Sequence, residues 1–401
     1  MVAYHHFVEL SQSGNSEERG QAAHLAALAF LAHTGPADEQ AALYAALIGF
    51  LDDPSVKVRA ALAYGLLHTT DAPRPILLAL LQDSRVIARA VAQYSPALID
   101  ADLRALIPTA DLTMLLAVAE RERMSLRVAA ALIARDEQGV TLRVLARGDF
   151  SPTAEMLGAL AEAKAENAKI RGALLARKDL PAAARLLLVE AVTKALREIR
   201  IVKGAIAPRR LERLLRNSTD DAMTLIGERE AARVDAGYAA QLVQSSRINT
   251  RVMLHAIVNG HVLFFADCVA ELSEMPREKV FTLLEHGSRS ALNALLVRCG
   301  LVEGVRNLIC RLIFHARTAD LADDVASRHF VVTALTEELI VEHDGVIPPE
   351  LEEAFSYLSE QNVALARQAA RGVMSAFGGE RLGHMPVPAI EPEERLALPA
   401  A

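Results

Sequence analysis

Two segments of the chain carry one residue pattern at an offset of 30 positions. The stretch LDDPSVKVRAALAYGL begins at residue 51, and the stretch LQDSRVIARAVAQYS begins at residue 81. Their alignment superposes an acid, an apolar residue and an arginine: Asp53 on Asp83, Val56 on Val86 and Arg59 on Arg89. Repeats of roughly 20 to 50 residues are typical of arrays of stacked helical or strand units. This repeat therefore constrains the fold more than any other feature of the chain.

The first copy predicts a helix. Val58, Leu62 and Leu66 recur at intervals of four, which places them on one helical face. Asp53 stands where an N-cap belongs, and Pro54 stands where a first helical position tolerates a missing N–H. The segment PRPILLALLQD between the copies is long enough for the second helix of a hairpin. Looser copies of the acid-to-arginine or apolar-arginine pattern follow at Glu137–Arg143, Leu126–Arg127 and Ile170–Arg171.

Composition favours closely packed helices over a β-sandwich. The 401 residues are 52% hydrophobic but only 4% aromatic, with no Trp, and the hydrophobic residues are mainly Ala and Leu. A net charge of −7 gives no global attraction to nucleic acid or anionic lipid. Cys268, Cys299 and Cys310 lack zinc-site spacing and are interpreted as small buried hydrophobes in a reducing compartment. Because the N-terminus MVAYHHFVEL also lacks the pattern of a secretory signal, we expect a soluble cytoplasmic protein.

The repeated pattern resembles a known helical repeat. D-P-x-x-x-V-R followed by A-L-A is similar to the HEAT repeat, a helical hairpin that stacks into a superhelix. The run from LDDPSVKVRAALA to LIDADLRALI, together with NGHVLFFADCVAELSEMPREKVFTLLEHGSRSALNALLVRCGL at 259–301, more closely resembles an alphaproteobacterial family of HEAT-like domains of unknown function, numbered 2336. The resemblance covers roughly residues 40–310 and brings no assigned activity. It implies that the acid and arginine of each copy tie adjacent repeats together, so that Arg89→Ala lowers thermal stability. A partner-binding role for these residues is the alternative.

The sequence predicts an all-α fold, a HEAT-like helical-hairpin solenoid with a second helical subdomain. The expected parts are an N-terminal segment (1–20), the array (21–203), the second subdomain (204–343), a C-terminal helix (350–377) and a disordered acidic tail (378–401). The β-branched segment ASRHFVVTALTEELIVEH is expected to be a helix because of its length.

No catalytic constellation is predicted. His255, His261 and Asp267 are each six residues apart, and on a helix such steps point in different directions. Cys268 lies in an apolar helical context and is interpreted as an inert buried thiol. The nearby Leu263, Phe264 and Phe265 are interpreted as core, and a partner-binding anchor is the alternative. The sequence contains no P-loop, dinucleotide-binding loop or G-x-S-x-G elbow. We therefore expect no enzyme activity, no cofactor and no metal.

One segment breaks the charge balance of the chain, at residues 194–216. Its basic residues are the candidate partner-binding residues: Lys194, Arg197, Arg200, Lys203, Arg209, Arg210, Arg213 and Arg216. Only Glu198 and Glu212 oppose them, and Leu211, Leu214 and Leu215 are expected to face a core. The segment is either a solvated face or a binding site for an acidic protein segment, a phosphate-bearing ligand or nucleic acid. The predicted function is a non-catalytic scaffold or adaptor that binds a protein partner, and nucleic-acid or other polyanion binding through this segment is the alternative.

Overall fold

The structure is a computed structural model that describes residues 2–234 and 237–381. Within these ranges all regular secondary structure is helical, which confirms the predicted all-α class. The chain divides into two compact units, Met1–Ala191 (unit 1) and Val192–Ala401 (unit 2). The predicted boundary at residues 203 and 204 lies inside unit 2.

Unit 1 is built from short helices. Their bounds are α1 (Val2–Ser11), α2 (Ser16–Ala32), α3 (Ala37–Leu51), α4 (Val56–Leu66), α5 (Arg74–Leu80), α6 (Arg85–Tyr94), α7 (Asp100–Leu106), the 3₁₀ turn η1 (Ile107–Thr109), α8 (Leu112–Ala119), α9 (Leu126–Ala134), α10 (Gln138–Leu145), α11 (Ala154–Lys164) and α12 (Ala168–Leu175). Helix α13 (Ala182–Glu198) contains the division between the units. Several helices begin at a polar N-cap that accepts a backbone N–H, as Asp111, Ser125 and Thr153 do for α8, α9 and α11.

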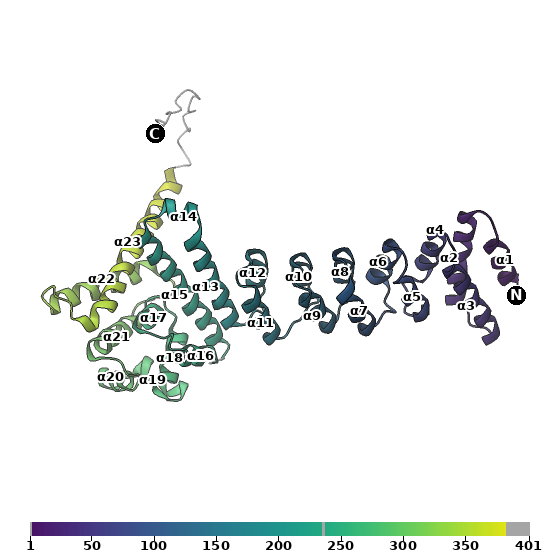
Figure 1. Cartoon of the computed structure of the whole chain (residues 1–401). Helices are drawn as coiled ribbons and strands as arrows, with labels where there is room; N and C mark the ends of the chain where they lie inside the picture. The colour runs from purple at the N-terminus through teal and green to yellow at the C-terminus, as the bar shows by residue number, and fades with distance from the viewer. Residues whose placement is uncertain (1, 235–236, 382–401) are drawn as a thin grey trace, which may run out of the picture. The chain divides into compact units, whose positions relative to one another are not determined.

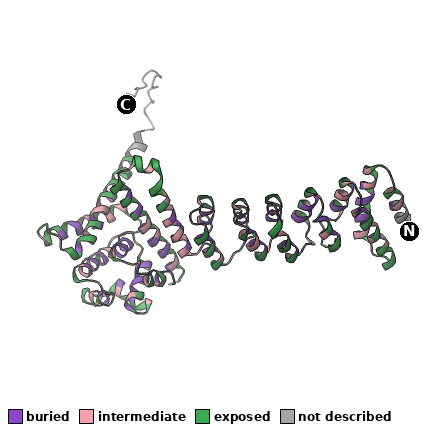
Figure 2. Cartoon of the chain, viewed as in Figure 1, coloured by how far each residue is buried: buried purple, intermediate pink, exposed green. Residues whose placement is uncertain are grey.

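The helices of unit 1 form two layers. Helices α2, α4, α6, α8, α10 and α12 contact one another in succession along one layer. Figure 1 shows α3, α5, α7, α9 and α11 along the other side. Buried apolar side chains form one cluster from Phe7 to Leu188, and Figure 2 colours the buried residues of these helices purple. The helices of unit 1 thus bury their apolar side chains against one another.

Arginine–aspartate pairs join successive repeats at the start of unit 1. Arg19 Nε lies 2.7 Å from Asp53 Oδ2, and Arg59 Nε lies 2.6 Å from Asp83 Oδ2. Arg59 of the first copy therefore pairs with the acid of the second copy, and Arg19 on α2 pairs with the acid of the first. The hydrogen bond from Arg59 holds the pKa of Asp83 below its usual value. Arg89 is exposed, and its side chain forms no ion pair or hydrogen bond with residues 2–234 or 237–381. The prediction that Arg89 ties two repeats together is therefore wrong.

The predicted start of the first repeated helix is also wrong. Helix α4 begins at Val56, with Ser55 in the N-cap position. Asp53 instead accepts the Ser55 N–H at 2.8 Å while it binds Arg19. The Asp53 carboxylate therefore holds the turn before α4, and Ser55 occupies the N-cap position.

Later repeats use arginines that donate to backbone carbonyls. Arg121 donates to the carbonyls of Ala92 and Ser95, Arg147 to those of Ala119, Arg121 and Glu122, and Arg177 to those of Leu145 and Phe150. These acceptors lie 25 to 32 residues earlier in the chain, about one repeat away. Several of these carbonyls belong to the last turn of a helix, such as those of Ala119 in α8 and Leu145 in α10. Carbonyls at a helix end lack an intrahelical hydrogen-bond partner, and the guanidinium of the arginine supplies one.

Unit 2 contains longer and more varied helices. They are α14 (Arg200–Ala205), α15 (Pro208–Ala232), α16 (Gly237–Gln244), α17 (Thr250–Val258), α18 (Val262–Ser273), α19 (Arg277–His286), α20 (Arg289–Arg298), α21 (Glu303–Ala316), α22 (Val325–Glu342), the 3₁₀ turn η2 (Pro349–Leu351) and α23 (Glu352–Arg381). Helix α22 confirms that the β-branched segment is helical. Helix α23 continues past the predicted end at residue 377, and the rest of the predicted tail lies outside the described residues.

Helix α17 is the centre of unit 2. It contacts α15, α18, α21 and α23, and every residue from Arg251 to Val258 is buried. Gly260 lies in the short connection between α17 and α18 and has a φ of +74°. A Cβ added at this position would lie 2.5 Å from Ala322 Cα. Only glycine fits this backbone conformation and this close approach. Phe264 and Phe265 on α18 are buried, which confirms their interpretation as core, whereas Leu263 is only half-buried.

Candidate partner-binding surfaces

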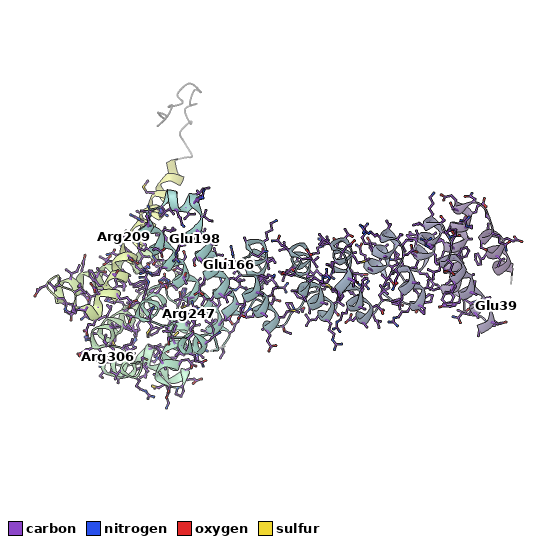
Figure 3. The ribbon with its side chains drawn as sticks, in the orientation of Figure 1. Glu39, Glu166, Glu198, Arg209, Arg247 and Arg306 are labelled. Carbon is purple, nitrogen blue, oxygen red and sulfur yellow. The ribbon has the colours of Figure 1, made fainter. Side chains whose placement is uncertain are left out.

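The basic segment, residues 194–216, covers the end of α13, all of α14 and the start of α15. All eight of its predicted binding residues are exposed, and Figure 3 labels Arg209 on α15 and Glu198 at the end of α13. On α15, Leu211 and Leu215 are buried, and successive turns place Arg209, Arg213 and Arg216 on the opposite side of the helix. Leu214 is 44% exposed, so its predicted burial is wrong: it lies at the border between the buried and the basic sides.

Two acids neutralise two of the basic side chains. Arg197 Nε lies 2.8 Å from Glu212 Oε1, which links the end of α13 to the start of α15, and Lys203 Nζ lies 2.8 Å from Glu198 Oε2. Five arginines have side chains that form no ion pair or hydrogen bond with the described parts of the chain: Arg200, Arg209, Arg210, Arg213 and Arg216. Their charges are available to a ligand.

Two exposed tyrosines occupy equivalent positions in consecutive repeats. Tyr64 on α4 is 66% exposed and Tyr94 on α6 is 51% exposed. Each ring lies beside a histidine, with ring centroids 5.5 Å apart for His24 and Tyr64 and 5.8 Å apart for His68 and Tyr94. Tyr64 and Tyr94 lie 30 positions apart, the same offset that aligns the two copies. Comparison of the two copies in the sequence could therefore have identified this shared position.

A polar groove lies beside Tyr94. Its volume is about 620 Å³, and Tyr94, Arg121, Glu122, Arg123 and Asp149 are among the residues that line it. Arg121 is buried, and this burial lowers the pKa of its guanidinium. Because both positive and negative side chains line the groove, it offers hydrogen-bond donors and acceptors to the peptide backbone of a partner.

A buried polar network joins α15, α17 and α23 in unit 2. Arg251 Nε lies 2.7 Å from Asp220 Oδ2, and Arg251 Nη2 lies 3.1 Å from Glu360 Oε2. Burial acts to lower the pKa of Arg251, but the hydrogen bond and charge of Asp220, joined by Glu360, raise it above its usual value. The guanidinium also lies 5.1 Å from the centre of the Tyr357 ring. The network fixes the position of α23 on the unit.

His255 belongs to the same network. Its Nε2 lies 2.7 Å from Asp221 Oδ1, and its Nδ1 lies 3.1 Å from the Tyr357 hydroxyl. Tyr357 is fully buried, so a substrate has no access to its hydroxyl, and the arrangement is structural. The sequence spacing could not have predicted it, because Asp221 and Tyr357 come from helices distant in the chain.

His261 and Asp267 make no contact with each other that would form a site. Burial lowers the pKa of His261 to about 4. Asp267 Oδ1 lies 2.8 Å from Arg277 Nε, and burial outweighs this partner and raises the pKa of Asp267 to about 6. Burial also raises the pKa of the Cys268 thiol, and it raises the pKa of Cys299 to about 11.

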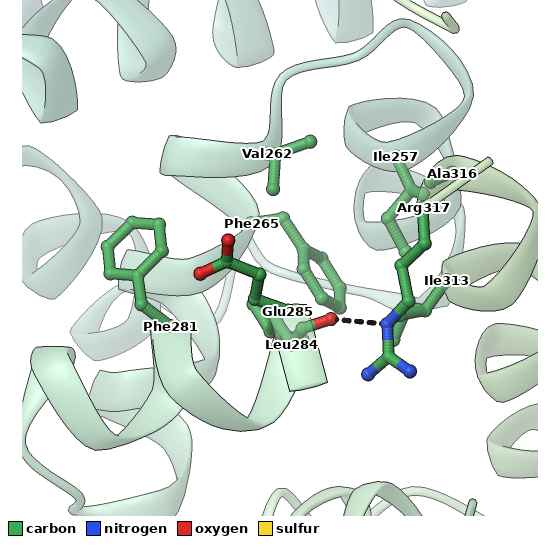
Figure 4. A pocket seen from close by; sticks show the side chains of 9 residues that line it. All are labelled: Ile257, Val262, Phe265, Phe281, Leu284, Glu285, Ile313, Ala316 and Arg317. Atoms are coloured by element: carbon green, nitrogen blue, oxygen red, sulfur yellow. Dashed lines mark hydrogen bonds between the residues drawn. The ribbon is translucent and has the colours of Figure 1, made fainter. Parts of the chain in front are cut away.

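An apolar cavity of about 270 Å³ lies between α17, α18, α19 and α21 (Figure 4). Its walls include Ile257, Phe265 and Ile313. The guanidinium of Arg317 donates to the Leu284 carbonyl at 2.8 Å and to the Leu283 carbonyl at 3.0 Å, so its donors are directed at the protein itself. The cavity can accept a small apolar group.

Two further properties concern the whole described chain. Across residues 2–234 and 237–381, no group of three or more His, Cys, Asp or Glu side chains is arranged to hold a metal ion. In the same ranges, no helix combines the length and the apolar character needed to cross a bilayer.

The fold defines the class of the chain as an all-helical protein built from many short helices. The sequence model of an uncharacterised protein family conserved in bacteria (DUF2336) matches residues 87–342, and the chain belongs to this family. The match begins and ends further along the chain than the resemblance found from the sequence. No curated protein and no solved structure matches the chain.

Proposed function

We propose that the protein is a non-catalytic cytoplasmic adaptor whose unit 1, a HEAT-like solenoid, binds an extended segment of a protein partner. A HEAT-like character and an alphaproteobacterial origin, both implied by the sequence resemblance, are part of this proposal. The observation that carries it is the pair of exposed tyrosines, Tyr64 and Tyr94, at one position of consecutive repeats.

The two rings have the properties of binding hot spots. Tyrosine supplies a large contact area and has few rotatable bonds to immobilise. The neighbouring His24 and His68 support each ring on one side and restrict its motion further. Helices α4 and α6 contact each other, and packed helices lie about 8 to 10 Å apart, which an extended chain spans in about three residues. A partner segment that crosses both helices can therefore contact both rings and reach the groove beside Tyr94.

Affinity purification from the source bacterium tests this proposal. The wild-type chain is compared with the Tyr64→Ala/Tyr94→Ala variant and with Tyr64→Phe/Tyr94→Phe, which keeps the rings. Phe330→Ala is a matched control, because Phe330 is 70% exposed on α22 of unit 2. A partner should be lost from the alanine variant alone, and the purified partner should bind that variant at least about 100-fold more weakly. Equal recovery of every protein by a folded alanine variant contradicts the proposal.

A second candidate function is polyanion binding through the basic segment. It is supported by the five exposed arginines without partners in the described chain. Binding to phosphates should weaken steeply as salt rises, because bound counterions are released. A gel-shift assay at low salt in which neither duplex nor single-stranded nucleic acid is retained contradicts the nucleic-acid form of this function.

A further inference from the structure

The basic segment is a local charge feature of an acidic chain. It contains eight of the 43 Lys and Arg residues and two of the 50 Asp and Glu residues, so its net charge is +6 in a chain of net charge −7. The remaining residues therefore carry a net charge of −13. Such separation directs anionic surfaces to this segment, whereas the rest of the chain repels them.

Exposed aliphatic side chains lie among these cations. Ile201 on α14 is 82% exposed, and it stands between Arg200 and Lys203 in the sequence. Ile199, at 45% exposure, comes just before α14. Leu196 and Leu214 are also exposed. Ile201 is the most exposed large hydrophobic side chain in the described part of the chain. A ligand that covers these side chains gains free energy by removing their apolar surface from water.

The basic and aliphatic residues lie on or next to helices α13, α14 and α15, and α13 and α15 are joined by an ion pair. The Arg197–Glu212 pair links the end of α13 to the start of α15, and α14 is the connection between these helices. The buried Leu211 and Leu215 fix α15 so that its arginines face away from the rest of unit 2. Residues 194–216 therefore expose arginines and aliphatic side chains within one short stretch of the chain.

From this combination we infer that the basic segment binds the surface of a bilayer that contains anionic lipids. Guanidinium groups bind the lipid phosphates, while Ile201 and Ile199 enter the boundary between the headgroups and the acyl chains. Nucleic acid fits less well, because residues 194–216 contain no aromatic residue to stack on a base and nucleic acid leaves the isoleucines in water. Neither cavity described above includes a residue of the segment, so a bilayer surface fits it better than a bound peptide. This inference narrows the second candidate function to one polyanion and is independent of the tyrosines of unit 1.

Vesicle cosedimentation with the full chain tests the inference. The vesicles contain either phosphatidylcholine alone or equal parts of phosphatidylcholine and phosphatidylglycerol, at about 0.1 M and about 0.5 M salt. The wild-type chain should bind the anionic vesicles alone, and more weakly at high salt. Arg209→Glu/Arg213→Glu/Arg216→Glu should lower this binding at least about 100-fold. Ile201→Asn should lower it about tenfold, because one exposed isoleucine no longer enters the bilayer.

Matched controls come from exposed residues elsewhere in unit 2. Lys279→Glu/Arg289→Glu/Arg298→Glu changes the net charge by the same amount on α19 and α20, and Val346→Asn removes another exposed aliphatic side chain. Both controls should bind anionic vesicles like the wild type. The inference is overturned if the wild type does not bind anionic vesicles at low salt, or if Ile201→Asn binds them like the wild type. It is also overturned if the charge control loses as much binding as the segment variant.

A duplex DNA probe separates the two forms of polyanion binding. Tight DNA binding that Ile201→Asn leaves unchanged, without binding to anionic vesicles, overturns the inference and supports the nucleic-acid alternative. The tyrosine variants should bind vesicles like the wild type, so failure of the adaptor proposal and failure of this inference give different results.

Discussion

Replacement of Arg251 by methionine should strongly destabilise unit 2. The side chain of Arg251 is only 6% exposed and pairs with Asp220, whose side chain is 10% exposed, and with Glu360. Methionine fills much of the same space but leaves both carboxylates without their cation. Removal of one partner of a buried ion pair costs about 3 to 5 kcal/mol. For a unit of this size, 1 kcal/mol changes the melting temperature by about 2 to 4 °C, so we expect a decrease of about 10 °C.

Differential scanning calorimetry of the full chain measures this change. Addition of Asp220→Asn to Arg251→Met should restore part of the lost stability, because the buried charge is then removed. Arg311→Met is the control: Arg311 pairs with Glu338 and Glu342 at the surface, where ion pairs contribute about 0 to 1 kcal/mol. A decrease below about 2 °C for Arg251→Met, or no recovery in the double variant, would refute the reasoning.

Three further variants test other parts of the fold. Arg59→Ala should lower the free energy of unfolding by about 1 to 3 kcal/mol in urea titrations, because Asp83 loses its partner, whereas Arg89→Ala should change it by less than about 0.5 kcal/mol; equal effects would contradict the pairing. Folded Asp267 keeps its proton up to about pH 6, against a usual pKa of 3.8, so the folded state binds more protons between these values. The contribution of Asp267 to stability should therefore fall as pH rises from about 4 to 6. Asp267→Asn removes this contribution, so its stability should change more favourably than that of the wild type as pH rises across that range in urea unfolding; an unchanged slope would contradict this assignment. Gly260→Ala should lower the free energy of unfolding by at least about 2 kcal/mol, because of backbone strain and the contact of the new Cβ with Ala322. Gly300 has a φ of +73° but nothing near its added Cβ, so Gly300→Ala should lower the free energy of unfolding by only about 1 kcal/mol. Calorimetry that ranks the two variants in the opposite order would rule out the steric explanation.

The sequence predicted the fold class because the evidence for it is local. The 30-residue offset and the four-residue apolar spacing of Val58, Leu62 and Leu66 are properties of single helices. The predicted tie between adjacent copies is present for Arg59 and Asp83 but not for Arg89, because each pair depends on the residues of the following copy. Arg59 reaches an acid 24 residues later, and the residue 24 positions after Arg89 is Thr113, which has no charge. Comparison of one copy with the next would have predicted this difference.

The candidate surfaces also combine features that the sequence predicts with features that depend on tertiary packing. The exposure of the basic residues at 194–216 followed from their charge, but the exposure of Leu214 depends on how far the core of unit 2 extends around α15. The network of Arg251, His255 and Tyr357 could not be predicted, because it joins residues about 100 positions apart in the sequence. Only the packing of α23 on α17 brings them together.

The arginines that donate to carbonyls have a consequence for how this array can evolve. A carboxylate partner disappears when one codon changes, but every residue type, proline included, carries a carbonyl oxygen. Arg121, Arg147 and Arg177 therefore keep their acceptors whatever side chains occupy those positions, provided that the helix ends stay in place. Successive repeats can then diverge until they no longer look alike while the same bonds join them.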